Sequence, residues 1–229
     1  MLKNLFKRLK DWERRVSWSF GDDISTPEKR REARRHFNLV DHAFLRVWWT
    51  NLGQVAPGVW RSNQPSPERI AKYAEMGIKS IITLRGPNRF SYHLFEEEAC
   101  ARHGIDFHIC HLAARSLVPR ELVLELLELF ETVQRPVLFH CKSGADRAGL
   151  AAAFWLLHME GATLERAKQE FSFRYLHIKS TKTGVLDYML NAYGEDTKDN
   201  PMGIKEWIAT RYDHAALIEG YRASREGGS

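Results

Sequence analysis

Apolar and polar positions follow a helical period at the start of the chain. Six apolar residues recur at spacings of three and four between Leu2 and Val16, while lysines and arginines fill the other faces. This pattern predicts a basic amphipathic helix over residues 1–18. Residues 26–28, Thr-Pro-Glu, are typical of a helix cap with proline at the first helical position, and they predict a charged helix to about Phe37.

Strand-like and helix-like patterns alternate in the remainder of the chain. Pro57-Gly58 is a turn signal within a short strand pair at 55–61. Further strands are predicted at 79–84, 105–112 and 136–140, and helices at 66–76, 91–103, 119–133, 147–159, 163–173, 184–193 and 202–224. This alternation predicts an α/β fold with a central four- or five-stranded, mostly parallel sheet flanked by helices on both faces.

Composition restricts the class of protein. The chain has 229 residues, 44% hydrophobic and 28% charged, which fits one soluble domain with a single core. The net charge of +5 comes entirely from residues 1–36, with eleven Lys/Arg against six Asp/Glu, and the rest balances. A nucleic-acid binder would carry its positive charge on the fold itself, so nucleic acid is not an expected partner. We therefore divide the chain into a basic helical extension, residues 1–47, and one α/β domain, residues 48–229.

The cellular compartment follows from the cysteines and from the N-terminal pattern. Three cysteines form neither a disulfide framework nor a zinc-type pair spacing, and neither a secretory signal nor a membrane-spanning stretch is recognisable. We therefore expect a cytoplasmic protein. The helix at 1–18 leaves two alternatives open: it either lies on an anionic membrane, here the inner membrane surface, or packs on the domain.

The segment with the clearest chemical signal is 136–149, Pro-Val-Leu-Phe-His-Cys-Lys-Ser-Gly-Ala-Asp-Arg-Ala-Gly. A strand runs into a loop that begins at Cys141, and a helix begins near Arg147. Successive N–H groups of such a loop can bind a phosphate dianion, and the helix N-terminus stabilises a thiolate. Arginine offers a planar fork for two phosphate oxygens. The pattern predicts nucleophilic catalysis on a phosphate ester.

This His-Cys-x5-Arg-x-Gly segment resembles the signature of the protein tyrosine phosphatase superfamily. Residues 59–65 and 77–85 are also similar to the opening of its small microbial dual-specificity branch, so the resemblance covers about residues 54–193. It implies a cysteine-phosphatase fold for the 48–229 domain, without a metal or another cofactor.

The resemblance also implies roles for individual residues. Cys141 would be the nucleophile and Arg147 the phosphate ligand. His140 would position the loop and tune the thiol. The backbone amides of the loop would bind phosphate oxygens, namely those of Lys142, Ser143, Gly144, Ala145, Asp146 and Arg147.

Two features depart from the family pattern. The superfamily usually has Ser or Thr after the signature arginine, where the hydroxyl helps the sulfur to leave, but Ala148 stands here. Ser143 is a partial substitute, or the intermediate breaks down more slowly. The second departure is the general acid, because the stretch 113–121 lacks the usual aspartate.

Asp146 is the candidate acid, since it occupies a position that resembles the loop of the myotubularin lipid phosphatases. The alternative is that it pairs with a nearby base or caps the following helix. A basic residue at Lys142 resembles the loops of phosphatases acting on inositol lipids and phosphatidylglycerophosphate; the alternative is a solvated lysine.

The remaining polar residues carry weaker signals. Arg61, Gln64 and Arg85 end strands or turns and can brace the site. After the helix at 163–173 follows a polar cluster, namely His177, Lys179, Lys182 and Thr183. It either reaches the pocket or, more simply, forms a surface loop. The two other cysteines, Cys100 and Cys110, are interpreted as buried fillers.

These observations predict a cysteine-dependent phosphomonoester phosphatase that forms a cysteinyl-phosphate intermediate. The substrate would be a phosphotyrosine or phosphoserine protein or a phospholipid headgroup. The alternative is a catalytically weak module that binds phosphorylated partners.

Overall fold

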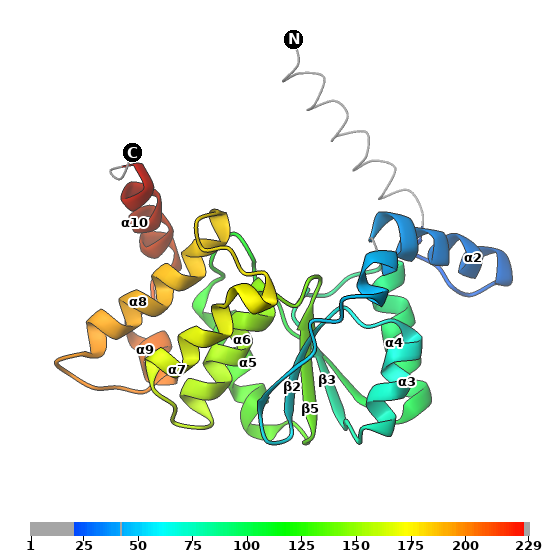
Figure 1. The fold of residues 1–229 in the computed structure, drawn as a ribbon, viewed down its shortest axis with the longest axis horizontal. Coiled ribbons are helices and arrows are strands. Elements are labelled where there is room, and N and C mark those ends of the chain that lie inside the picture. The colour runs from blue at the N-terminus through cyan, green and yellow to red at the C-terminus, as the bar shows by residue number, and fades with distance from the viewer. Residues whose placement is uncertain (1–20, 42, 227–229) are drawn as a thin grey trace, which may run out of the picture.

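A central sheet with helices on both sides forms the body of the molecule (Figure 1). The computed structural model describes residues 21–41 and 43–226. Within them, five strands pair in the order β1-β2-β5-β3-β4. Only the β1–β2 pair is antiparallel. The strands are β1 (Gly53–Ala56), β2 (Val59–Asn63), β3 (Ser80–Thr83), β4 (Asp106–Ile109) and β5 (Val137–Cys141). The predicted fold class is confirmed.

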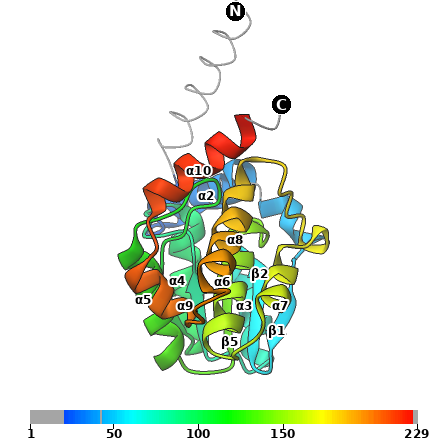
Figure 2. The same ribbon diagram turned by 90° about the vertical axis from the view of Figure 1, so that its left-hand side faces the viewer.

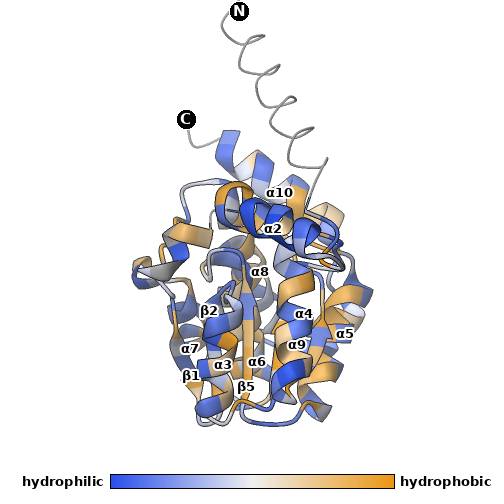
Figure 3. Cartoon of the chain, turned by 90° about the vertical axis from the view of Figure 1, so that its right-hand side faces the viewer, coloured by the Kyte–Doolittle hydropathy of each residue, from blue (hydrophilic) through white to orange (hydrophobic). Residues whose placement is uncertain are grey.

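Central strand β5 is buried over its whole length, as a strand covered on both faces must be. It is mostly orange in Figure 3, whereas α2 is mostly blue. On one face of the sheet lie α3 (Pro67–Glu75) and α4 (Ser91–His103), and on the other α5 (Arg120–Thr132) and α6 (Asp146–His158) (Figure 1). Residues 148–156 of α6 are all buried, which confirms the buried helix predicted there.

Strand β4 is shorter than its predicted range of 105–112. Beyond Ile109 the backbone still donates from Cys110 to Thr83 and from Leu112 to Leu84, but the regular ladder has ended. An edge strand has one neighbour only, so its apolar pattern does not fix where regular pairing stops.

The C-terminal region is helical, as predicted, but the expected helix at 202–224 is divided into two. Its first part ends at Thr210, and the Asp213 side chain accepts hydrogen bonds from the amides of Ala215 and Ala216, which starts a second helix. The elements are α7 (Leu164–Lys168), η3 (Gln169–Phe171), η4 (Phe173–Tyr175), η5 (Lys182–Gly184), α8 (Val185–Thr197), α9 (Ile204–Thr210) and α10 (His214–Glu226).

The N-terminal elements are α2 (Pro27–Arg35), η1 (His36–Val40) and η2 (Ala43–Val47). The Thr26 hydroxyl accepts from the amide of Lys29, as the cap pattern predicts. This segment packs on α4, where the ring of Phe37 lies 6.1 Å from that of Phe95. In Figure 2, α2 and α10 lie at the same end of the molecule.

Three predictions at the N-terminus are not tested. The amphipathic helix at 1–18 lies outside the described residues, and its membrane contact stays a prediction, as does the domain boundary at residue 48. No helix in the part of the chain that the structure describes is long and apolar enough to span a bilayer.

Candidate active site

The loop that follows β5 begins at the carboxyl edge of the sheet. In the parallel ladders Cys141 pairs with Asn63 of β2, and His140 pairs with Ser62 of β2 and with Thr83 of β3. The ends of the three inner strands therefore meet at the start of the loop. In open parallel sheets this edge is where ligands bind.

Gly144 makes the tight turn of this loop. Its φ is +73°, and a Cβ built at this position would lie 2.7–2.8 Å from backbone atoms of Ser62 and Asn63. Both features require glycine. The Gly144 amide donates to the Cys141 sulfur across 3.2 Å, so the turn brings a backbone N–H group to the thiol.

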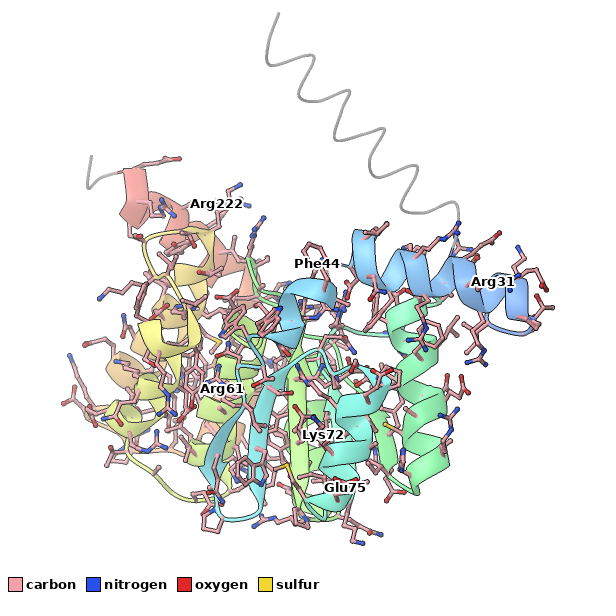
Figure 4. All side chains as sticks on the ribbon, turned by 45° about the vertical axis from the view of Figure 1, so that its right-hand side comes forward. Arg31, Phe44, Arg61, Lys72, Glu75 and Arg222 are labelled. Carbon is pink, nitrogen blue, oxygen red and sulfur yellow. The ribbon has the colours of Figure 1, made fainter. Side chains whose placement is uncertain are left out.

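A buried arginine of β2 braces the loop from below. Arg61, labelled in Figure 4, is 0% exposed and donates to the carbonyl oxygens of Gly144 and Ala145 at 2.7 and 2.9 Å. Its other nitrogen pairs with the Glu170 carboxylate at 2.9 Å, and its guanidinium carbon lies 3.9 Å from the centroid of the Tyr175 ring. The suggested bracing role of Arg61 agrees with these contacts.

Asn51 holds the third carbonyl of the loop. Its amide donates to the carbonyl oxygens of Ser143 and Tyr175, both at 3.0 Å. Three successive loop carbonyls, at 143–145, are thus bound on the protein side. Of the amides in this stretch, that of Gly144 is directed at the Cys141 sulfur, and anion binding by the loop amides stays a prediction.

Arg147 lies in the first turn of α6 with its guanidinium uncommitted. Its Nε is buried and has no hydrogen-bond partner within the described chain. The Nε atoms of Arg46, Arg61 and Arg69 are also unpaired, but the terminal nitrogens of those three side chains make hydrogen bonds, whereas those of Arg147 make none within the described residues. Buried donors are almost always paired, so this arginine is the candidate ligand group. A phosphate oxygen is the acceptor that would complete it.

Asp146 is joined to His177, one of the polar residues for which the sequence left two alternatives, reach into the pocket or a surface loop. His177 Nδ1 lies 2.8 Å from Asp146 Oδ1, and His177 Nε2 lies 2.7 Å from Asp187 Oδ2. The histidine side chain is 1% exposed, so its interpretation as part of a surface loop was wrong. Asp146 begins α6 without a side-chain cap bond, and its described partner is the base that the alternative interpretation required.

Burial alone would lower the pKa of His177, but hydrogen bonds to Asp146 and Asp187 and their charges raise it to about 9. A raised pKa means that the protonated form stabilises the fold. This contribution is complete below pH 6.5, the ordinary value, and disappears as the pH rises through about 9.

We therefore expect His177→Gln to lower the free energy of unfolding by up to about 3 kcal/mol at pH values below 6.5. The difference between the native protein and the variant should shrink as the pH rises to 9. Urea unfolding across this range measures it. A difference that is constant with pH would show that His177 contributes packing alone.

A second network lies under the start of the loop. His140 Nε2 is 2.6 Å from Glu96 Oε1, and Gln64 donates to Glu96 Oε2 at 2.7 Å. Gln64 accepts from Arg85, which pairs with Asp41. His140, Gln64 and Glu96 are all buried. Sequence reasoning missed Glu96 and Asp41, because each lies far from residue 141 along the chain.

The first departure from the family pattern, Ala148, is completely buried next to Arg147. The Ser143 hydroxyl, its possible substitute, accepts a long hydrogen bond of 3.4 Å from the Ala145 amide.

The two other cysteines lie in the core. Burial raises the pKa of Cys110 to about 12 and also raises that of Cys100, so both behave as inert core residues. This agrees with their interpretation as buried fillers.

A family model described as a DSP-PTPase phosphatase fused to NAD⁺ kinase matches residues 46–184, which is more than half of the chain. The chain therefore belongs to this family of dual-specificity-type phosphatases. It is 33% identical over 104 residues to the inositol diphosphatase DSP4 of Arabidopsis thaliana. That match covers 43% of this chain and 51% of DSP4, so the chain spans about half the length of this curated relative.

Solved structures show the same fold at low sequence identity. TpbA of P. aeruginosa aligns with a TM-score of 0.51 and 18% identity, over 75% of this chain and 90% of TpbA. The core catalytic domain of the PP-IP phosphatase SIW14 from S. cerevisiae aligns with a TM-score of 0.50 and 19% identity. That alignment covers 67% of this chain and 96% of the SIW14 domain.

Proposed function

We propose that this phosphatase hydrolyses phosphomonoesters through a cysteinyl-phosphate on Cys141. The observation that supports the proposal is the Arg147 side chain, which makes no hydrogen bond within the described residues and follows a loop whose carbonyls are bound by Asn51 and Arg61. In this proposal the phosphate is bound between the Cys141 sulfur, the backbone N–H groups and the guanidinium. Arg147 and the loop amides stabilise the negative charge of the phosphate.

The reaction has two steps. The Cys141 thiolate attacks phosphorus, the P–O bond to the leaving group breaks, and the leaving oxygen takes a proton from a general acid. Water then attacks phosphorus and gives a proton to the group that acted as the acid, which is thereby restored, while the P–S bond breaks and inorganic phosphate and the thiolate are released. Without a hydroxyl at Ala148, the second step is the slower one.

The substrate class rests on the surroundings of the loop and on relatives. TpbA has been solved in complex with phosphotyrosine, DSP4 is an inositol diphosphatase and SIW14 is a PP-IP phosphatase. Phosphoproteins and phospholipid headgroups are the substrate classes that the sequence predicts. Lys142, 42% exposed and next to Cys141, favours a substrate with further negative charge beside the scissile phosphate.

Rapid mixing with an aryl phosphate tests the mechanism. We expect a burst of about one equivalent of phenolate per enzyme, followed by slower turnover, because the phospho-enzyme accumulates. Ala148→Ser should raise the steady-state rate and reduce the burst.

Tight phosphate binding without any phenolate release would instead support the binding module. Parallel assays on a phosphotyrosine peptide, phosphatidylglycerophosphate vesicles and an inositol pyrophosphate then rank the substrates.

A further inference from the structure

One buried carboxylate, Asp41, faces three cations at the side of the phosphate loop. Its side chain is 3% exposed. Asp41 Oδ2 lies 2.6 Å from Arg46 Nη2, and Oδ1 lies 2.8 Å from Arg85 Nη2 and 3.5 Å from Lys142 Nζ. In Figure 1, the blue segment that follows α2 and carries Asp41 lies beside the upper ends of the strands.

The three cations are not held equally. The side chains of Arg46 and Arg85 are only 8% and 9% exposed. Arg46 also donates to the Asp41 carbonyl, and Arg85 donates to Gln64 with its guanidinium 3.4 Å from the centroid of the Tyr92 ring. Lys142 makes one longer contact and is 42% exposed. Lys142 is therefore the cation that can exchange Asp41 for another anion.

The charges around Asp41 keep both members of the Asp41–Lys142 pair ionised, so only another anion can replace Asp41. Burial by itself would raise the pKa of Asp41, but Arg85, Arg46 and Lys142 lower it to about 2, so the carboxylate stays charged. Burial lowers the pKa of Lys142, Asp41 raises it, and Arg85 and Arg46 lower it again. Asp41 thus keeps an ammonium charged next to two buried guanidiniums.

We propose that Asp41 is a positioning residue that holds Lys142 beside the loop 141–147. A second anionic group of the substrate then replaces Asp41 as the partner of Lys142. This rests on the proposed function, since it assigns a substrate class, multiply charged phosphate compounds, to the same site. A compound with one phosphate is bound by Arg147 and the loop amides. A compound with a neighbouring phosphate competes with Asp41 for Lys142, and the segment before residue 46 thereby tunes the affinity of the site.

A double-mutant cycle on Asp41→Asn and Lys142→Met tests this. Calorimetric titration of the full chain with inorganic phosphate and with tripolyphosphate gives a Kd for each anion without needing turnover. Asp41→Asn should tighten tripolyphosphate binding by about fivefold or more relative to phosphate, because Lys142 is released. In the Lys142→Met background the same substitution should change the ratio of the two Kd values by much less.

Glu98→Gln is the matched control. Glu98 binds Arg30 of α2 at 2.7 Å and Arg102 at 2.6 Å, so its loss removes one carboxylate that holds the same N-terminal segment to α4. It lies outside the Asp41 network, and the Kd ratio should not change.

Asp41→Asn also leaves the buried guanidiniums of Arg46 and Arg85 without the Asp41 carboxylate, which destabilises the folded state and can prevent folding. Asp41→Glu keeps the charge and displaces the carboxylate from Lys142, and it replaces Asp41→Asn in the cycle if that variant does not fold. Equal Kd ratios in the Asp41 variant and in Glu98→Gln would overturn the proposal, as would an equal effect with and without Lys142. Failure of the proposed function is a separate result, namely no release of phosphate from an aryl phosphate by the native chain.

Discussion

Cys141→Ser is expected to abolish turnover and to leave phosphate binding intact. A serine hydroxyl is a far weaker nucleophile than a thiolate and a worse leaving group in the second step, so the rate should fall on the order of 10⁴-fold or more. The groups that shape the anion position do not involve the sulfur. Arg61 and Asn51 still bind the loop carbonyls, and Arg147 still presents its unpaired Nε.

Steady-state assays on an aryl phosphate and calorimetric titration with inorganic phosphate measure the two halves of this prediction. Cys100→Ala is the matched control, because Cys100 is a buried thiol in a separate part of the core. The Cys100→Ala protein that folds should hydrolyse the aryl phosphate at the rate of the native protein. Substantial hydrolysis by the Cys141→Ser protein would exclude the cysteinyl-phosphate mechanism.

The parts of the site that the sequence predicted are those that lie together along the chain. The strand, the turn at Gly144 and the helix that begins at Asp146 are local, and the turn requires glycine at one position. The signature from Cys141 to Arg147 could therefore be recognised without any knowledge of tertiary contacts.

The residues that brace the loop come from elsewhere in the chain. Asn51, Asp41, Glu96 and His177 reach it through side chains separated from it by tens of residues, and spacing alone says nothing about such contacts. His177 is instructive, because its polar neighbours suggested solvent. It is buried because its segment, between η4 and η5, lies against the first turns of α6 and α8, where Asp146 and Asp187 each satisfy one ring nitrogen.

The same limit applies to the fold. The sheet and its helices follow from periodicity, since a strand covered on both faces needs a continuous apolar run. The break between α9 and α10 depends on Tyr212, whose side chain is buried and donates to the Val118 carbonyl at 2.7 Å. Such an anchor cannot be read from an amphipathic pattern that continues on both sides of it.

The contacts of Asp146 are compatible with either of its two roles, general acid or structural partner. Its Oδ1 contacts His177, and the side chain is 18% exposed at the start of α6, one residue before Arg147. Kinetics on two kinds of leaving group can therefore decide between an acid and a structural partner.

If Asp146 is the acid, Asp146→Asn should lower the rate on an alkyl phosphate by about 10²–10⁴, because an alkoxide must be protonated as it leaves. The loss on an aryl phosphate with an acidic phenol should be much smaller, since that leaving group needs no proton. Steady-state kcat/KM on the two substrates measures the ratio.

Asp187→Asn provides the matched control, because it removes the other carboxylate bound to the same histidine. It disturbs His177 without touching the loop, so it should lower both rates by the same factor, if at all. Equal losses on alkyl and aryl phosphates in Asp146→Asn, matching those of Asp187→Asn, would assign Asp146 to positioning His177. In that case the proton for the leaving group must come from another residue or from water.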